Sequence, residues 1–378
     1  MRPHSSTRLD TTHGTIELRS LRADEALTHP GTLLAPDGRI IAPYDLEQRD
    51  ARIGEHVALA SQPGIHNAAA NPFELDYSSV AVAHVINGMG VTLGDSIIGL
   101  SALAAIRHAH PHLRFVVYRP ELAPPFVEQL YALASDSVAE IRRLPWPLVA
   151  IPRDEARIDL GNQLFWPGFV ALPMIDFFLD ALGVRPASVP ATHKANRWLQ
   201  ALELPRLPET CRNQPYVLFC ATASTPIRSI AQSVRRELVS RLFERFGVPV
   251  LGFGPVDHPR YVDVTAASSS TAHFLAWIKH ARYVMTADTA AVHIAAGFDV
   301  PTTAFFSTIA PELRMRDYPF CCPVTLELPE LRNVQASERE QDMARLHGAY
   351  QKVMGGELPF AALRATAIEE AAAGDRTR

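Results

Sequence analysis

The chain has 378 residues, 47% hydrophobic and 20% charged, which is long enough for two globular domains with full cores. A formal net charge of −4 and an isoelectric point near 6.4 argue against a nucleic-acid-binding protein that relies on a general basic surface. No apolar signal core opens the sequence, and no run approaches the roughly 18 apolar residues of a spanning helix, so we expect a soluble or at most peripheral protein. Four cysteines without a C-x-x-C pair fit a reduced cytoplasm.

Residues 1–78 are predicted to form an N-terminal accessory segment. The runs Thr32-Leu33-Leu34 and Arg39-Ile40-Ile41 flank the sequence Ala-Pro-Asp-Gly, in which proline fixes φ and Gly38 supplies a positive φ. This pattern predicts a β-hairpin. An added surface hairpin is the favoured interpretation, and a lid or an oligomer contact is the functional alternative.

The first α/β domain is predicted over residues 79–205. A buried strand at 80–86 leads into a glycine-rich turn and then a helix that ends near 109, and a second strand follows at 115–118. This order predicts a strand–helix–strand unit. The turn contains Gly88, Gly90 and Gly94, which allow the backbone to bend tightly beside a ligand.

The glycine turn can be compared with two nucleotide-binding patterns. It does not match a Walker loop, because no lysine follows the last glycine. It matches the dinucleotide fingerprint imperfectly, since its spacing is G-x-G-x-x-x-G and Glu121 follows the second strand. Asp95, directly after Gly94, falls in the first turn of the predicted helix. The helix dipole favours an ionised carboxylate there, which could accept a proton or could serve only the helix start.

Metal binding is not expected from this sequence. His108, His110 and His112 alternate beside Pro111 without a neighbouring cysteine or carboxylate, which favours a solvated turn over a zinc site. The chain also contains no D-x-D pair.

A second α/β domain is predicted over residues 212–335, after a proline-containing linker at 204–213. A strand at 216–220 is followed by a polar turn that carries Arg228 and Ser229. Next comes a helix that ends at Gly247. A strand at 248–252 then leads to Asp257.

The most informative stretch runs from 283 to 293. An apolar strand ends at Asp288-Thr289, and the small residues that follow, beginning with Ala290 and Ala291, suit a helix. Free amides and the dipole at such a helix start favour an anion such as a diphosphate. His293 lies four residues after Thr289, on the same helical face. A further strand at 302–306 completes a parallel unit.

Together the two halves predict an α/β protein of two Rossmann-like domains facing across a cleft. The remaining residues, 336–378, are charged and then alanine-rich, and they predict helices at 338–353 and 360–373.

The chain resembles the ADP-heptose:lipopolysaccharide heptosyltransferases, which are glycosyltransferase family 9 proteins with the GT-B fold. The similarity spans roughly residues 80–330 and is strongest at 88–103, where Gly94-Asp95 opens a helix, and at 283–306, with its Asp-Thr, His and Pro-Thr pattern. Two departures stand out. The family usually has glycine where this chain has Ala290, and a Phe-Gly-Pro-Thr turn where it has Phe306-Ser307-Thr308.

This resemblance implies an inverting, metal-independent transfer of a sugar, heptose from ADP-heptose, onto a hydroxyl of a lipopolysaccharide core or another glycan. It implies an acceptor domain at 79–205, a donor domain at 212–335, terminal helices that cross back to the first domain, and no cofactor. The setting implied is the cytoplasm, with at most peripheral contact at the inner face of the membrane. Asp95 is implied as the catalytic base. The implied donor-binding residues are Arg228, Ser229, Asp257, Asp288, Thr289, Ala290, Ala291 and His293.

Two alternatives stay open. The glycine turn leaves room for an NAD(P)-dependent oxidoreductase. The departures at Ala290 and Ser307 leave room for a non-catalytic nucleotide-sugar-binding protein that keeps the fold.

Overall fold

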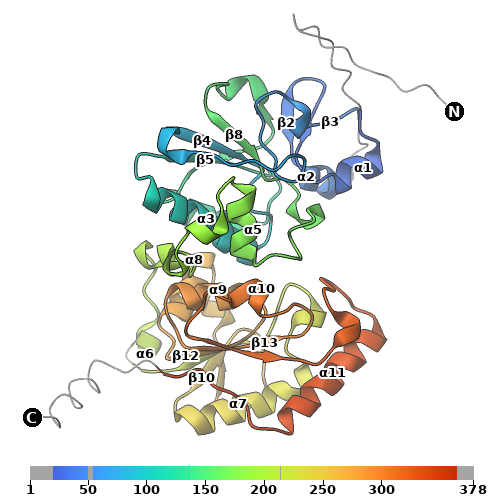
Figure 1. Cartoon of the computed structure of the whole chain (residues 1–378). Coiled ribbons are helices and arrows are strands. Elements are labelled where there is room, and N and C mark those ends of the chain that lie inside the picture. The colour runs from blue at the N-terminus through green and yellow to red at the C-terminus, as the bar shows by residue number, and fades with distance from the viewer. Residues whose placement is uncertain (1–19, 50–53, 136, 213, 364–378) are drawn as a thin grey trace, which may run out of the picture. The chain divides into compact units, whose positions relative to one another are not determined.

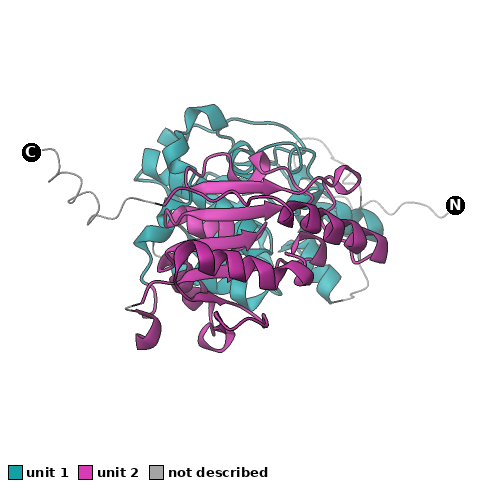
Figure 2. Cartoon of the chain, turned by 90° about the horizontal axis from the view of Figure 1, so that it is seen from below, with its two compact units in different colours: residues 1–203 teal, residues 204–378 magenta. Residues whose placement is uncertain are grey.

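A computed structural model describes residues 20–49, 54–135, 137–212 and 214–363. The chain divides into two compact units, residues 1–203 and residues 204–378, coloured separately in Figure 2. We call them unit 1 and unit 2. The boundary falls at the start of the linker predicted over 204–213.

Unit 1 is built on a four-stranded parallel sheet in the order β6-β5-β4-β8. The chain runs outward from β4 to β6 and then returns to place β8 on the other side of β4. Helix α3 packs against α4 and α5. The bounds are β4 (Val82–Ile86), α3 (Leu93–Ala109), β5 (Arg114–Arg119), α4 (Pro125–Ala134), β6 (Glu140–Arg143), β8 (Ala156–Asp159) and α5 (Met174–Ala181).

The N-terminal segment supplies three strands of a second, antiparallel sheet in unit 1, and β7 adds the fourth, in the order β3-β1-β2-β7. The predicted hairpin is confirmed, with Gly38 at φ +81° in its turn. The bounds are α1 (Ala23–Thr28), β1 (Leu33–Leu34), β2 (Arg39–Ile41), α2 (Pro43–Gln48), β3 (Val57–Ala58) and β7 (Trp146–Pro147).

This segment is a layer of the unit 1 core and not an added surface hairpin. Leu34 and Ile40 are buried in one cluster with Val82 and Ile86 of the central strand β4. Because side chains alternate along a strand, Val82 and Ile86 point to one face of the parallel sheet, and the N-terminal segment covers that face. Local sequence patterns cannot show such burial, since the partners are far apart in the chain.

Unit 2 contains a six-stranded parallel sheet in the order β11-β10-β9-β12-β13-β14, the strand order of a doubly wound nucleotide-binding fold. The bounds are α6 (Glu209–Arg212), β9 (Val217–Cys220), α7 (Gln232–Phe246), β10 (Val250–Gly252), β11 (Tyr261–Asp263), α8 (Thr271–Lys279), β12 (Tyr283–Ala287), α9 (Ala290–Gly297), β13 (Thr302–Phe306), α10 (Glu312–Met315), β14 (Cys321–Thr325) and α11 (Glu340–Met354). The predicted α/β architecture of two parallel units is confirmed.

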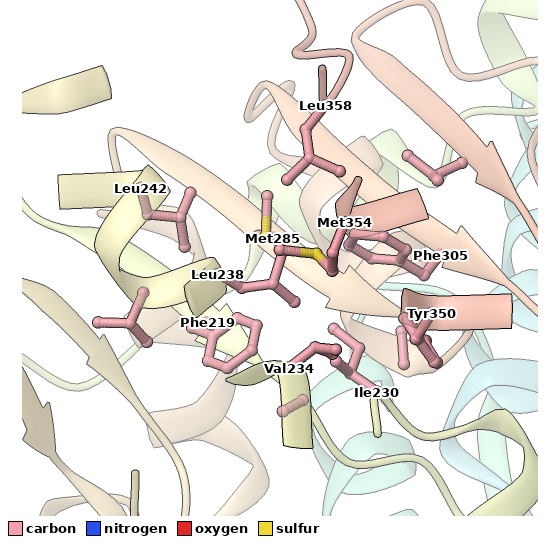
Figure 3. Close-up of a cluster of buried hydrophobic side chains, with 14 of the residues drawn as sticks. Phe219, Ile230, Val234, Leu238, Leu242, Met285, Phe305, Tyr350, Met354 and Leu358 are labelled. Atoms are coloured by element: carbon pink, nitrogen blue, oxygen red, sulfur yellow. The ribbon is translucent and has the colours of Figure 1, made fainter. Parts of the chain in front are cut away.

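Helices α7 and α11 cover one face of the unit 2 sheet, and α8, α9 and α10 lie on the other side (Figure 1). Figure 3 shows Leu238 of α7 and Met354 of α11 meeting Phe219, Met285 and Phe305 from the strands. Full burial of each such side chain contributes roughly 2 kcal/mol. Helix α11 is thus part of the unit 2 core. Of the second predicted terminal helix, residues 360–363 are irregular and the rest lies outside the described residues.

Candidate functional site

Each unit has a topological switch point, where successive connections leave in opposite directions from the carboxyl ends of two neighbouring strands. It lies between β4 and β8 in unit 1 and between β9 and β12 in unit 2. Open parallel α/β sheets bind ligands at this place. The predicted site residues, except Asp257, follow β4, β9 or β12 directly or sit on the turns and helices that start there.

In unit 1 the glycine turn leads into α3 as predicted. Thr92 caps the helix, and its hydroxyl accepts a hydrogen bond from the Asp95 amide at 3.4 Å. Asp95 therefore lies in the first turn of a long helix, half-buried, where the dipole favours its ionised form. Gly94 lies inside the same helix.

The turn itself is held by a buried arginine from β5. Arg119 donates to the carbonyls of Gly88 and Gly90, and its Nε pairs with Glu128 at 3.0 Å. Met89 and Gly90 both have φ +68°, a conformation that costs a non-glycine residue roughly 1 kcal/mol or more. The carbonyls of Gly88 and Gly90 thus face a side chain of unit 1.

Two residues that the sequence reasoning missed lie beside this turn. Gln163 donates from Nε2 to Oδ2 of Asp95 at 3.2 Å. Asp159, at the end of β8, is fully buried and accepts from the amide and hydroxyl of Thr32 and from the amide of Gly161. Burial raises the pKa of the Asp159 carboxyl. The signal in the sequence was a polar run, Asp-Leu-Gly-Asn-Gln, directly after a strand.

In unit 2, Arg228 and Asp288 form an ion pair across the switch point. Nε and Nη2 of Arg228 both lie 3.1 Å from Oδ2 of Asp288, and Nη2 also donates to the Asp288 carbonyl at 2.8 Å. Only 2% of the Asp288 side chain is exposed, against 18% for Arg228. The other oxygen, Oδ1 of Asp288, is buried without a hydrogen-bond partner. Arg228, which the resemblance implies as a donor-binding residue, is thus held in place by a buried carboxylate.

The start of α9 offers fewer free amides than the sequence suggested. The Thr289 hydroxyl accepts from the Ala291 amide at 3.0 Å, and the Thr289 carbonyl accepts from the amide of Val292. The amides of Thr289 and Ala290 have no hydrogen-bond partner within the described part of the chain. Those two amides and the dipole of an eight-residue helix remain for an anion.

His293 is a buried, neutral residue rather than an exposed contact. Its Nδ1 lies 2.9 Å from the hydroxyl of Tyr318. Burial lowers the pKa of His293 to about 3, although the nearby Asp288 carboxylate opposes that shift. A buried imidazole that stays neutral can pack against the site, but it adds no positive charge near pH 7.

Ser229 and Asp257, two other predicted donor-binding residues, differ in their burial and in their contacts. Ser229 braces the turn after β9, since its hydroxyl accepts from the Ala223 amide at 2.9 Å and donates to the Thr225 carbonyl. Asp257 is fully exposed and pairs with Arg236 of α7 at 2.8 Å. The described contacts do not bring Asp257 to the Arg228–Asp288 pair.

His108 lies beside His193, with the ring centroids 4.2 Å apart and the ring planes tilted by 34°. Within the described ranges, no three His, Cys, Asp or Glu side chains gather as metal ligands would. The same part of the chain holds no helix with the length and apolar character needed to cross a bilayer.

No protein-family description and no curated protein matches the chain. Solved structures similar to it include the ADP-heptose lipopolysaccharide heptosyltransferase II of E. coli, with 14% identity, a TM-score of 0.45, and coverage of 73% of this chain and 98% of that one. Another is E. coli heptosyltransferase WaaC with ADP-2-deoxy-2-fluoro heptose, at 14% identity, TM-score 0.42, and 72% and 99% coverage. A third is a family 9 glycosyltransferase of Veillonella parvula, at 15% identity, TM-score 0.44, and 75% and 99% coverage. At this level of similarity the function has to be inferred from the residues of the chain itself.

Proposed function

We propose that the chain is a glycosyltransferase that moves a sugar from a nucleoside-diphosphate donor to a hydroxyl of a glycan, with inversion at the sugar carbon. The observation that carries this proposal is the unit 2 switch point. It combines a partly exposed guanidinium, two amides without partners and a helix start on a doubly wound sheet. These groups suit a diphosphate.

The proposed reaction uses Asp95 as the base and Arg228 with two backbone amides as the diphosphate site. Asp95 accepts the proton of the acceptor hydroxyl, whose oxygen forms a bond to the sugar carbon while the bond from that carbon to the diphosphate oxygen breaks. Arg228 and the amides of Thr289 and Ala290 stabilise the charge that develops on the leaving diphosphate.

The resemblance in the sequence names the first substrates to test: ADP-heptose as donor and a heptose-deficient lipopolysaccharide core as acceptor. We propose a cytoplasmic reaction, with at most peripheral contact at the inner face of the membrane, and no metal requirement. The last point predicts full transfer in the presence of EDTA.

The experiment is native mass spectrometry of the full chain with ADP-heptose, other nucleotide sugars, ADP and NAD, followed by transfer assays with the donor that binds. Binding of a nucleotide sugar and formation of a glycosylated acceptor support the proposal. Tight binding of NAD without any nucleotide sugar rejects it in favour of the oxidoreductase. A donor that binds and is never transferred identifies a binding protein.

A further inference from the structure

The side chain of Gln163 is enclosed at the unit 1 switch point. Gln163 is 3% exposed, and its Nε2 lies 3.2 Å from Oδ2 of Asp95. Gly90 borders both groups, since a Cβ built on this glycine would lie 2.2 Å from the same nitrogen and 3.3 Å from Oδ2 of Asp95. With φ +68°, Gly90 is also in a conformation that favours glycine. The amide of Gln163 therefore packs against the glycine turn and the Asp95 carboxylate together.

The loop that carries Gln163 is fixed from two directions. Its Gly161 amide donates to Oδ1 of Asp159 at 2.9 Å, and its Gly161 carbonyl accepts from Nε1 of Trp166 at 2.8 Å. Asn162 has φ +56°, and its Nδ2 donates to the carbonyls of Leu27 and His29 at 2.9 and 2.8 Å. The bonds of Asn162 reach the N-terminal segment directly, and those of Gly161 reach it through Asp159, which is bound by Thr32.

That segment supplies the main partner of Asp159. The Thr32 amide donates to Oδ2 at 2.9 Å and the Thr32 hydroxyl donates to Oδ1 at 2.5 Å. Asn67 adds a third donor at 3.2 Å. A buried carboxylate is costly unless it is fully hydrogen-bonded, so these donors hold the end of β8 and the following loop in one position.

A neutral amide is well suited to orienting a general base. It fixes one carboxylate oxygen by a hydrogen bond, and it adds no positive charge that would make the carboxylate a poorer proton acceptor. A rotamer held in this way also lowers the cost of ordering the base when the acceptor binds.

We propose that Gln163 is a positioning residue for Asp95, and that the N-terminal segment serves the reaction by holding the loop that delivers it. The kinetic part of this inference rests on the proposed function, because Asp95 is the base of that reaction.

The test compares Gln163→Met with wild type, with Gln62→Met in the N-terminal segment as the matched control. Loss of the amide is expected to lower kcat about tenfold while KM for the nucleotide sugar stays unchanged. The acid limb of the pH profile is expected to move to higher pH, because a carboxylate that loses a donor holds its proton more tightly. Wild-type kcat and pH profile in Gln163→Met overturn the inference, while transfer by the wild type leaves the proposed function intact.

The role of the segment is tested through Thr32. Thr32→Val is expected to lower kcat, as Gln163→Met does, without changing KM for the nucleotide sugar. Thr32→Ser retains the hydroxyl and is expected to have the kcat of the wild type. Loss of kcat that Thr32→Ser does not restore contradicts delivery through Asp159.

A readout independent of activity keeps the two proposals separate. The side-chain amide signals of Gln163, observed by NMR in the full chain, should shift with pH in the wild type and lose that response in Asp95→Asn. A pH response that persists in Asp95→Asn, or none in the wild type, overturns the inference whatever the transfer assay shows.

Discussion

The switch points of units 1 and 2 both hold a carboxylate at the carboxyl edge of a parallel sheet, but they surround it in opposite ways. Asp95 is half-buried and receives a hydrogen bond from a neutral amide, that of Gln163. Asp288 is buried and paired with the guanidinium of Arg228. The Gln163 amide brings no charge of its own to Asp95, whereas the Arg228 guanidinium balances the charge of Asp288. We propose that Asp95 of unit 1 takes the proton and that Arg228 of unit 2 stabilises the negative charge of the leaving diphosphate.

Removing the proton acceptor tests this assignment most severely. Asp95→Asn keeps the shape of the side chain, and we expect transfer to fall by about 1000-fold in kcat, within the range of general-base catalysis. The matched control is Asp257→Asn, an exposed carboxylate in unit 2 that should leave kcat unchanged. Full activity in Asp95→Asn would show that unit 1 does not supply the base.

Breaking the ion pair between Arg228 and Asp288 tests how much this pair stabilises the folded chain. Asp288→Ala leaves Arg228 in a mostly buried place without its partner, and we expect unfolding to become easier by about 3 kcal/mol in urea denaturation. The double variant Arg228→Met/Asp288→Leu removes both charges and should recover most of that stability. Equal stability of Asp288→Ala and the wild type would mean that the pair contributes little.

The packing of the unit 1 turn is tested by two glycines with similar φ. Gly90→Ala meets both an unfavourable φ of +68° and the Gln163 amide, so a loss of about 2 kcal/mol is expected. Gly38→Ala has an equally unfavourable φ of +81° but open space around it, and should cost only about 1 kcal/mol. Equal losses would indicate that the Gln163 amide moves away easily.

The last test concerns the buried imidazole of His293, close to the charge of Asp288. The pKa of His293 is lowered to about 3 in the folded chain, so below its ordinary value of 6.5 the unfolded chain takes up a proton that the folded chain does not. Its contribution to stability is present above pH 6.5 and is lost as the pH falls from 6.5 towards 3, by up to about 1.4 kcal/mol per pH unit. His293→Gln should therefore lose less stability than wild type between pH 6.5 and 5. Parallel curves would show that His293 is not held neutral by the fold.

Local signals predicted the elements well. Gly247 ends α7 with φ +66°, and Asp288-Thr289 marks the start of α9 as expected. Contacts distant in the chain could not be predicted from local patterns. Gln163 is 68 residues from Asp95, and neither position shows in isolation that an amide will meet a carboxylate. The sequence also does not show how many amides a cap leaves free, and here the Thr289 hydroxyl takes the amide of Ala291.

The bonds between Thr32 and Asp159 set a condition on how the chain is made. The two residues are 127 positions apart, which a ribosome covers in roughly 6–25 s. For that time β1 and β2 have been synthesised but β8, whose Asp159 accepts the hydrogen bonds of Thr32, has not. Unit 1 therefore cannot complete its fold before β8 leaves the ribosome.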